Sequence, residues 1–295
     1  MTRVLSYNIL LGGTPRIDAL DKMIRSAQPD VVGLVEATNA HVVEELAKRS
    51  GMHYALTGQG KWFNDWNVAI LSRRPILETI VHTHPQIFTR RYLLEVRLEG
   101  SGGQPLTIFV IHLTASMYKG TQSNLKRRVE VQQLLDIMRS HQGTPHLVMG
   151  DFNSLAPGDT FSASTIIRYI LQLRINKNKK LPPRPLRERV AITVAKALLH
   201  FPPGTLLLDK VGYRYAKGGI DLLLQAGYID SFRHLHPDQL GFTYPSSNPA
   251  TRIDYIFASP ELASSLVDCH ELTAGEGVQG KDASDHLPLL AEFDM

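Results

Sequence analysis

Short apolar runs that end in a polar residue recur along most of the chain, and such runs predict β-strands with buried faces. We expect strands at residues 4–7, 31–35, 54–57, 67–72, 93–98, 106–111 and 147–149. Apolar residues spaced three and four apart predict amphipathic helices at residues 17–27, 40–49 and 125–139. This order is neither a strict βαβ repeat nor all-β. It predicts a mixed α/β fold in which two mixed sheets pack face to face with helices outside.

Two of these strands carry more detailed expectations. The strand at residues 93–98 alternates apolar and charged residues, so we expect its apolar side alone to be buried. The strand at residues 147–149 is expected to stop at Gly150. If extended backbone persists beyond Gly150, Asp151 and Asn153 point to the same side, because side chains alternate along a strand.

The alternation of strands and helices breaks at about residues 157–210, which we interpret as a basic helical insertion. Helical spacing is present at residues 165–173 and 190–200, with a basic, proline-rich loop at residues 174–185 between them. Residues 155–214 hold eleven Lys and Arg against three Asp and Glu, or 11 − 3 = +8, in a chain of net charge +4. Four uses stay open: gating a site, contacting nucleic acid, docking on an anionic membrane surface, or forming a solvated surface element.

Length and composition narrow the class of protein. The chain has 295 residues, of which 43% are hydrophobic and 20% charged, as in an ordinary globular protein, and we expect a single domain over residues 1–295. It has no apolar run of the about 18 residues that suggest a transmembrane helix, and its first residues lack a signal-peptide pattern. Cys269 is the only cysteine, which excludes an intramolecular disulfide and a cysteine-based metal cluster. We expect a cytoplasmic monomer.

Polar residues that could bind a metal ion or take part in catalysis follow the predicted strands. Ligand and catalytic groups collect where strands end, because a rigid sheet presents short loops there. Asp151 is suited to steer or accept the proton of a water while Asn153 fixes its oxygen, although both residue types are also common in turns. Oxygen-rich groups without cysteine suit Mg²⁺ or Mn²⁺ better than Zn²⁺. The polar residues that end apolar runs are Asn8, Glu36, His112, Asp151, Asn153, Asp254, Asp285 and His286.

Six segments, in order and over nearly the whole chain, resemble the motifs of the endonuclease/exonuclease/phosphatase superfamily, which includes deoxyribonuclease I-like and exonuclease III-like enzymes. The resemblance implies a four-layered α/β sandwich and metal-assisted hydrolysis of a phosphate ester by water. The generic bacterial form of the superfamily is the most similar, and it leaves the substrate open. The segments are Ser-Tyr-Asn at 6–8, the strand ending in Glu36, Ile-His-Leu at 111–113, Gly-Asp-Phe-Asn at 150–153, Arg-Ile-Asp-Tyr-Ile-Phe at 252–257 and Ser-Asp-His-Leu-Pro at 284–288.

The resemblance also implies roles around the metal and the attacking water. Glu36 is expected to bind Mg²⁺ or Mn²⁺, with Asn8 beside it, and Asp285 is expected to complete the surroundings of the metal. Asp151 is expected to orient or deprotonate the water. Asn153 is expected to hold that water or a phosphate oxygen.

The remaining residues are expected to act on the phosphoryl group and the substrate. His112 and His286 would stabilise the charge on the phosphoryl group, and Asp254 would orient His286 and keep its imidazole cationic. Arg252 has two alternatives of equal weight, a contact with substrate or an ion pair with a neighbouring carboxylate. Asn67 precedes a strand as in many relatives, so it is assigned to substrate binding without a separate mechanism.

Four classes of function follow from these residues. The first is a Mg²⁺-dependent phosphodiesterase or phosphatase, and the second is a DNA or RNA nuclease that binds nucleic acid through the basic insertion. The third is a sphingomyelinase-like or phosphoinositide-type lipid-headgroup hydrolase, and the fourth is a binding module without chemistry. The segment Val-Glu-Ala-Thr at residues 35–38 departs from the Gln-Glu-Thr-Lys type of exonuclease III-like abasic-site enzymes, which argues against that specificity.

Overall fold

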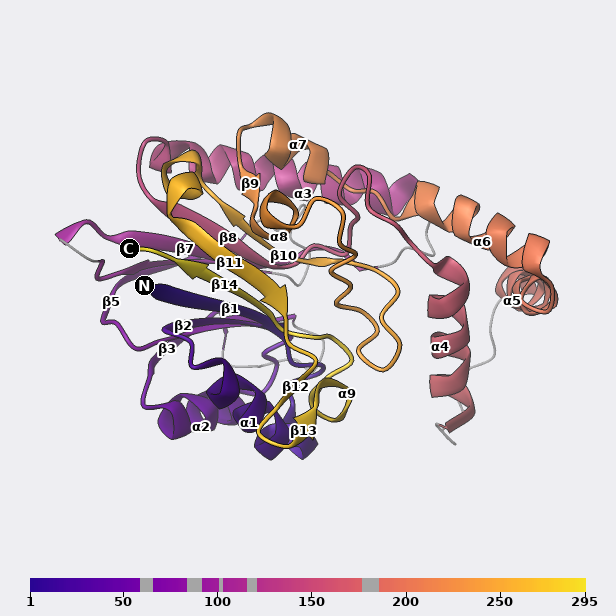
Figure 1. Cartoon of the computed structure of the whole chain (residues 1–295), viewed down its shortest axis with the longest axis horizontal. Coiled ribbons are helices and arrows are strands. Elements are labelled where there is room, and N and C mark those ends of the chain that lie inside the picture. Colours follow the sequence, from indigo (N-terminus) through magenta and orange to yellow (C-terminus); the bar gives the residue numbers. More distant parts are fainter. Residues whose placement is uncertain (59–65, 84–91, 101–102, 116–120, 177–185) are drawn as a thin grey trace.

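Two six-stranded β-sheets lie face to face at the centre of the molecule, and helices cover their outer faces (Figure 1). The computed structural model describes residues 1–58, 66–83, 92–100, 103–115, 121–176 and 186–295. Most of the basic loop expected at residues 174–185 therefore lies outside the described residues. In the described part of the chain, no helix is both long and apolar enough to cross a membrane. The expected mixed α/β fold with two packed sheets is confirmed.

The first sheet has the order β11-β14-β1-β2-β4-β3. Its central strands β1 and β2 are parallel, and each of the other neighbouring pairs is antiparallel. The parallel pair matters for function, because the two strands end at the same edge of the sheet. The strands are β1 (Thr2–Asn8), β2 (Val31–Val35), β3 (His53–Leu56), β4 (Val68–Ser72), β11 (Leu266–Glu271) and β14 (Leu289–Phe293).

The second sheet has the order β5-β6-β7-β8-β10-β9. It also contains one parallel pair, β7 and β8, among antiparallel neighbours. A small ribbon of β12 (Ala274–Gly275) and β13 (Val278–Gln279) stands apart from both sheets. The strands of the second sheet are β5 (Ile76–His82), β6 (Leu93–Leu98), β7 (Leu106–His112), β8 (His146–Asp151), β9 (Ile229–Asp230) and β10 (Asp254–Ala258).

Helices complete the outer layers. The first sheet is covered by α1 (Ile17–Ala27) and α2 (Ala40–Ser50), and the second by α3 (Thr121–Met138) and α7 (Ile220–Gln225) (Figure 1). Short helices α8 (Ser231–Leu235) and α9 (Gly280–Ala283) lie in connections. A group of helices, here named the helical segment, projects from this body; it consists of α4 (Ala163–Asn176), α5 (Leu186–Leu198) and α6 (Pro202–Tyr215) (Figure 1).

Alternation along the strands sorts the apolar residues into layers. In β1, Val4 belongs to the core between the sheets, whereas Leu5 packs under α1 and α2. In β8, Met149 points between the sheets and Val148 points to the α3 layer. The sheets approach closely at Gly33, where a Cβ atom would lie 2.6 Å from Met149 Cε. Strands that are buried on both faces therefore leave only their ends available for chemistry.

Most predicted elements are present within a few residues of their expected bounds, and three differences have clear causes. Strand β5 was not predicted, because three of its seven residues are polar and several are exposed at the sheet edge. Helix α6 was not predicted, since Pro202, Pro203 and Gly204 at its start are typical of a loop, although Pro is well tolerated in a first helical turn. Strand β8 runs through Gly150 to Asp151 instead of stopping at Gly150.

The expected single buried side of β6 is wrong, because Glu95 on its charged side is only 4% exposed. Two histidines explain this burial: Glu95 Oε2 lies 2.7 Å from His82 Nε2, and Glu95 Oε1 lies 3.0 Å from His141 Nε2. Burial raises the pKa of Glu95, but the hydrogen bond from His82 and the charges of both histidines outweigh it, so the pKa lies below its ordinary value.

Glu95→Gln is expected to lower the free energy of unfolding at pH 7 by about 1–2 kcal/mol, because each histidine loses its charged partner. A carboxyl group whose pKa is depressed in the folded protein stabilises it above the unfolded pKa of about 4.3, and this contribution is lost as the pH falls through the folded value. The difference in the free energy of unfolding between parent and variant should therefore vanish in acid. Urea titrations from pH 7 down to pH about 3 measure it, with the exposed Glu99→Gln as control. An equal effect of both variants would contradict the pairing.

Candidate active site

Polar residues from both sheets meet at one edge of the fold, where five strands end or begin. Asn8 is the last residue of β1 and pairs in register with Val35, the last residue of β2. His112 at the end of β7 pairs with Asp151 at the end of β8, and Asp254 at the start of β10 pairs with the same Asp151. Strand register, which local sequence does not display, therefore fixes these side chains as neighbours.

Gly150 sets the position of Asp151. Its φ of 141° lies in a region that L side chains rarely adopt, and a Cβ atom there would lie 1.9 Å from the carbonyl oxygen of Ile111. Glycine thus allows β8 to stay in contact with β7 up to its last residue. Asp151, the last residue of β8, is 2% exposed.

A tight turn, and not an extended backbone, brings Asn153 beside Asp151. Asn153 has a φ of 48°, and its backbone N–H donates to Asp151 Oδ1 at 2.8 Å. Its Nδ2 donates to the carbonyl of Leu113 at 3.1 Å. The expected strand alternation is therefore wrong beyond Gly150, because the Asp carboxylate binds the backbone two residues ahead. The Asp151 side chain nevertheless contacts Asn153, through the backbone N–H of that residue.

Asn8 joins the two sheets at the site. Its Nδ2 donates to Asp151 Oδ2 at 3.1 Å and lies 3.4 Å from Glu36 Oε1. Glu36 Oε2 accepts from the backbone N–H of Leu11 at 2.8 Å. Leu10, Leu11 and Glu36 all have positive φ values, of 52°, 49° and 58°. Such backbone costs of order 1–3 kcal/mol per residue and persists where the surrounding structure imposes it, often at functional sites.

A buried carboxylate orients His286. Nδ1 of His286 lies 2.8 Å from Asp254 Oδ2, which also accepts from Thr243 Oγ1 at 2.6 Å. Nε2 of His286 faces Asp151 Oδ2 at 3.9 Å. Burial lowers the pKa of His286, but Asp254, Asp151 and Asp285 outweigh it and raise the pKa to about 10. The imidazole is therefore cationic at neutral pH.

His112 approaches Asp151 from the other side. Its Nε2 lies 3.6 Å from Asp151 Oδ2, and the side chain is 2% exposed. The ring of Trp66 meets the His112 ring edge to face at a centroid distance of 5.6 Å. The two histidines thus place two imidazoles around one carboxylate oxygen.

Carboxylates in the site repel one another. Burial raises the pKa of Asp151, and Asp254 and Glu36 raise it further, against the lowering effect of His286. Burial likewise raises the pKa of Glu36, with Asp285 adding to the effect. Among the described residues, Asp285 Oδ1 is buried and has no hydrogen-bond partner. A buried acidic set with an unused oxygen fits a hard divalent cation, which would relieve the repulsion.

Among the described residues, one group of three is close enough to hold such a cation, and Glu36 with Asn8 lies beside it. Asp151, Asp254 and His286 offer atoms that all lie within 4.8 Å of one another. Asp254 Oδ2, however, already accepts two hydrogen bonds, which suits it better to positioning than to metal binding. Glu36, with the amide of Asn8 beside it, leaves oxygens that a cation prefers.

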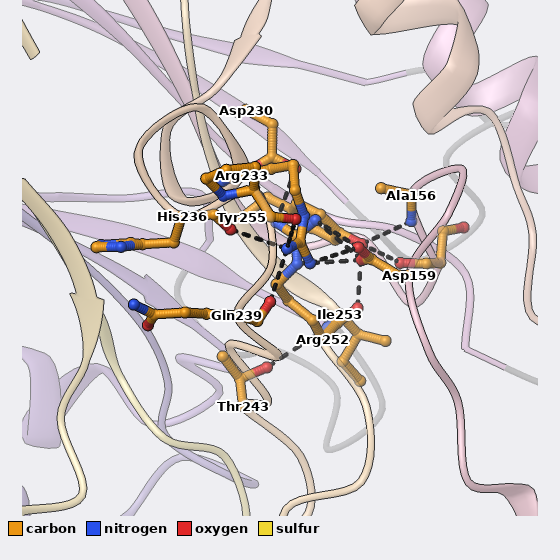
Figure 2. Close-up of polar contacts among 12 residues, drawn as sticks. Ala156, Asp159, Asp230, Arg233, His236, Gln239, Thr243, Arg252, Ile253 and Tyr255 are labelled. Atoms are coloured by element: carbon orange, nitrogen blue, oxygen red, sulfur yellow. Dashed lines mark hydrogen bonds and ion pairs between the residues drawn. The ribbon is translucent and has the colours of Figure 1, made fainter.

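Arg252 does not face the site. It is 0% exposed and pairs with Asp230 and Asp159, with Nη1–Oδ2 and Nη2–Oδ2 distances of 2.7 and 2.9 Å. Figure 2 shows these pairs together with Arg233 and Tyr255. Of its two alternatives, Arg252 therefore forms the ion pair. The pair supports the strand that carries Asp254, and Arg252 does not point to where the substrate would bind.

Asn67 lies at the edge of the site and is 1% exposed. Its backbone carbonyl accepts from the N–H of Ala37 at 2.9 Å, and its Oδ1 lies 3.4 Å from Thr57 Oγ1. Within the described residues, its Nδ2 is buried without a hydrogen-bond partner. The residue therefore holds the chain directly after Glu36, and its amide stays a predicted contact for substrate.

Three side chains near the site were not found from the sequence. The Tyr244 ring lies 4.7 Å from the His286 ring, and Tyr169 of α4 meets Tyr244 at 5.8 Å. Arg16 donates to the carbonyls of Leu10 and Ala283, which ties the loop after Asn8 to the end of α9, two residues before Asp285. No motif marks these residues, because each reaches the site only through tertiary contact.

Two stacked sheets with a carboxylate- and histidine-rich centre at one edge define the deoxyribonuclease I-like class of fold. The chain belongs to the Endonuclease/Exonuclease/phosphatase family, whose model matches residues 5–286. Members of this family are phosphoester hydrolases. No curated protein matches the chain by sequence.

Solved structures share the fold over the whole chain. An AP endonuclease from Archaeoglobus fulgidus is 20% identical with a TM-score of 0.62, and each chain is covered to 100%. The 3′ phosphatase NExo from Neisseria is 19% identical with a TM-score of 0.65, again with 100% of both chains covered. TDP2 from D. rerio, in a humanized form, is 17% identical with a TM-score of 0.62, covering 100% of this chain and 99% of the other. At such identities the likeness concerns the fold.

Proposed function

We propose that this protein is a divalent-metal-dependent phosphoesterase that hydrolyses a phosphate ester by attack of a water molecule. The observation that carries the proposal is the meeting of Asp151, Asp254 and His286 within 4.8 Å, with Asn8 linking Asp151 to Glu36. Membership of a family of phosphoester hydrolases supports the same class of reaction.

Asp151 is the group that takes or steers the proton of the water. Its raised pKa brings the carboxylate closer to the pH at which a general base is most effective. The amide of Asn153 has one N–H committed to Leu113, which leaves a second N–H and the amide oxygen to hold the water or a phosphate oxygen. The turn between the two residues fixes their relative position.

The two histidines act on the phosphoryl group. His286, held cationic by Asp254, and His112 present imidazoles beside Asp151 Oδ2. From there they would stabilise the negative charge that develops on the phosphoryl oxygens in the transition state. Asp254 is a positioning residue, because its carboxylate touches His286 and Thr243.

Glu36, Asn8 and Asp285 would hold the metal. Bound there, Mg²⁺ or Mn²⁺ supplies Lewis-acid stabilisation of the phosphate oxygens. Glu36 is prepared for this role by the N–H of Leu11, which fixes one carboxylate oxygen at 2.8 Å. Measuring the activity with each metal would decide between Mg²⁺ and Mn²⁺.

Chelation with EDTA is expected to abolish hydrolysis of a chromogenic phosphodiester, and added Mg²⁺ or Mn²⁺ should restore it. Glu36→Gln should raise the metal concentration needed for half-maximal rate by at least about tenfold, because a ligand charge is lost. The exposed Glu44→Gln on α2 is the matched control and should leave the metal titration unchanged. Full activity of the chelated enzyme would remove the metal from the proposal.

A nucleic-acid substrate is the second candidate. NExo is described as bound to a product DNA hairpin, and D. rerio TDP2 as complexed with single-strand DNA product. Plasmid nicking and digestion of 3′-phosphorylated oligonucleotides, beside sphingomyelin, inositol phosphates and nucleotides, would assign the substrate. Activity confined to the small or lipid substrates would reject the nuclease alternative.

A further inference from the structure

One face of α6 presents aliphatic side chains to solvent. Leu206, Leu207 and Val211 are 70%, 50% and 43% exposed. Exposed Lys210 and Arg214 lie on the same side of the helix, because positions four apart are neighbours on a helix surface. We name these five residues the α6 stripe. Contiguous exposed apolar surface of this kind marks interaction sites on soluble proteins.

The opposite side of α6 is fixed to the rest of the helical segment. A Cβ atom on Gly212 would lie 2.5 Å from Ala163 Cβ, which shows how closely α6 and α4 approach. Asp209 accepts from the backbone N–H of Ser164 at 2.7 Å and from its hydroxyl at 3.3 Å. The α6 stripe therefore faces away from a defined packing surface.

The helical segment projects from the body on the side away from the chain termini (Figure 1). The C-terminal end of α6 contacts the body, where Asn124 Nδ2 of α3 donates to the carbonyl of Arg214 at 3.0 Å. Among the described residues the helical segment carries three more large exposed apolar side chains, Ile170 on α4 at 39%, Val194 on α5 at 52% and Phe201 at 47%. With 14 residues, α6 is about 21 Å long, enough for the stripe to lie along a flat surface. In this position the α6 stripe is not covered by the two sheets (Figure 1).

The charge of residues 155–214 indicates which kind of partner the α6 stripe fits. Residues 155–214 carry +8, and two of their three acidic groups are directed inward: Asp159 pairs with Arg252, and Asp209 bonds Ser164. A nucleic-acid backbone would be bound by the cations alone and would leave the aliphatic side chains in water. Aliphatic side chains flanked by cations are the composition of a helix that lies in the interface of an anionic bilayer.

We propose that the α6 stripe docks the protein on the surface of an anionic lipid bilayer. Leu206, Leu207 and Val211 enter the boundary between headgroups and acyl chains, and Lys210 and Arg214 contact the anionic headgroups. Docking does not require hydrolysis, so an experiment can reject the docking without rejecting the proposed activity, and the reverse. It applies to the whole folded chain.

Flotation with vesicles tests the docking. The full-length protein is expected to float with vesicles of phosphatidylcholine mixed with phosphatidylglycerol, and to bind vesicles of pure phosphatidylcholine at least about tenfold more weakly. Leu206→Glu/Leu207→Glu should lower binding to the anionic vesicles at least about tenfold, while the melting temperature and the hydrolysis of a small phosphodiester stay unchanged.

The matched control introduces the same two negative charges at exposed aliphatic residues outside the helical segment. Leu77 is 58% exposed and Val267 is 50% exposed, and Leu77→Glu/Val267→Glu should float like the parent. Equal flotation of the parent and the Leu206→Glu/Leu207→Glu variant would overturn the proposal. So would absence of binding to anionic vesicles, loss of single-strand DNA binding in that variant without any vesicle binding, or a dimer in sedimentation that the variant breaks.

Discussion

Asp151→Asn is expected to lower the rate of phosphodiester hydrolysis by about 10³- to 10⁴-fold with little change in KM. The amide keeps the shape of the side chain, and its oxygen can still accept from Asn8 or Asn153, but it cannot take a proton from water. In metal-free buffer the variant should melt at an equal or higher temperature than the parent. The reason is that burial and neighbouring carboxylates raise the pKa of Asp151, so its ionised form is unfavourable in the folded protein above that pKa.

Two controls separate this base role from other causes. Asp282→Asn changes an exposed aspartate on α9 and should leave the rate unchanged. The metal concentration for half-maximal residual rate in Asp151→Asn should match that of the parent, in contrast to Glu36→Gln. A variant that retains most of its activity would refute the role of Asp151. A variant that loses activity only because more metal is needed would make Asp151 a ligand.

The strands that carry the site could be predicted because their burial is complete. Strand β2, at residues 31–35, is an apolar run with the expected bounds, and Glu36 is visible as a charge directly after its end. A strand that is buried on both faces is made almost entirely of apolar residues, so the first polar residue marks its end. Which ends meet depends on register and sheet order, and the family motifs supplied that information where local pattern did not.

Features formed by distant partners could not be predicted in this way. Glu95 looks like a solvent-facing residue until His82 and His141 are placed beside it. The turn at Asn153 follows from a hydrogen bond to Asp151, which alternation along a strand does not describe. Tyr169 reaches Tyr244 only because α4 packs there. In each case the sequence fixes the residue type, and tertiary contact decides its role.

Arg252 shows the same limit, and its two alternatives differ in what a substitution does. Its guanidinium contacts Asp230 and Asp159, and its Cζ lies 4.5 Å from the Tyr255 ring and 5.7 Å from the Phe232 ring. Burial lowers the pKa of Arg252, but Tyr255, Asp230 and Asp159 outweigh it, and the pKa lies above its ordinary value. A guanidinium held in this way tethers the start of β10, where Asp254 stands, to the chain that follows β8.

Arg252→Met is expected to lower the free energy of unfolding by about 3–5 kcal/mol, because it leaves buried Asp230 without its cation and Asp159 with Arg233 alone. Adding Asp159→Asn and Asp230→Asn should recover part of the loss, since the unpaired charges are then removed. Urea unfolding at pH 7 measures both effects. Arg128→Met is the matched control: Arg128 pairs with Asp221 at 2.8 Å on the surface, so its loss should change the free energy by less than about 1 kcal/mol.

Kinetics decide between the two alternatives for Arg252. If the guanidinium acts only through the buried pairs, the folded fraction of Arg252→Met keeps its KM, and activity falls in step with the folded fraction. A contact with substrate would instead raise KM in a variant of parental stability. That second result would return Arg252 to the substrate-binding residues and would make the buried ion pairs with Asp159 and Asp230 dispensable for folding.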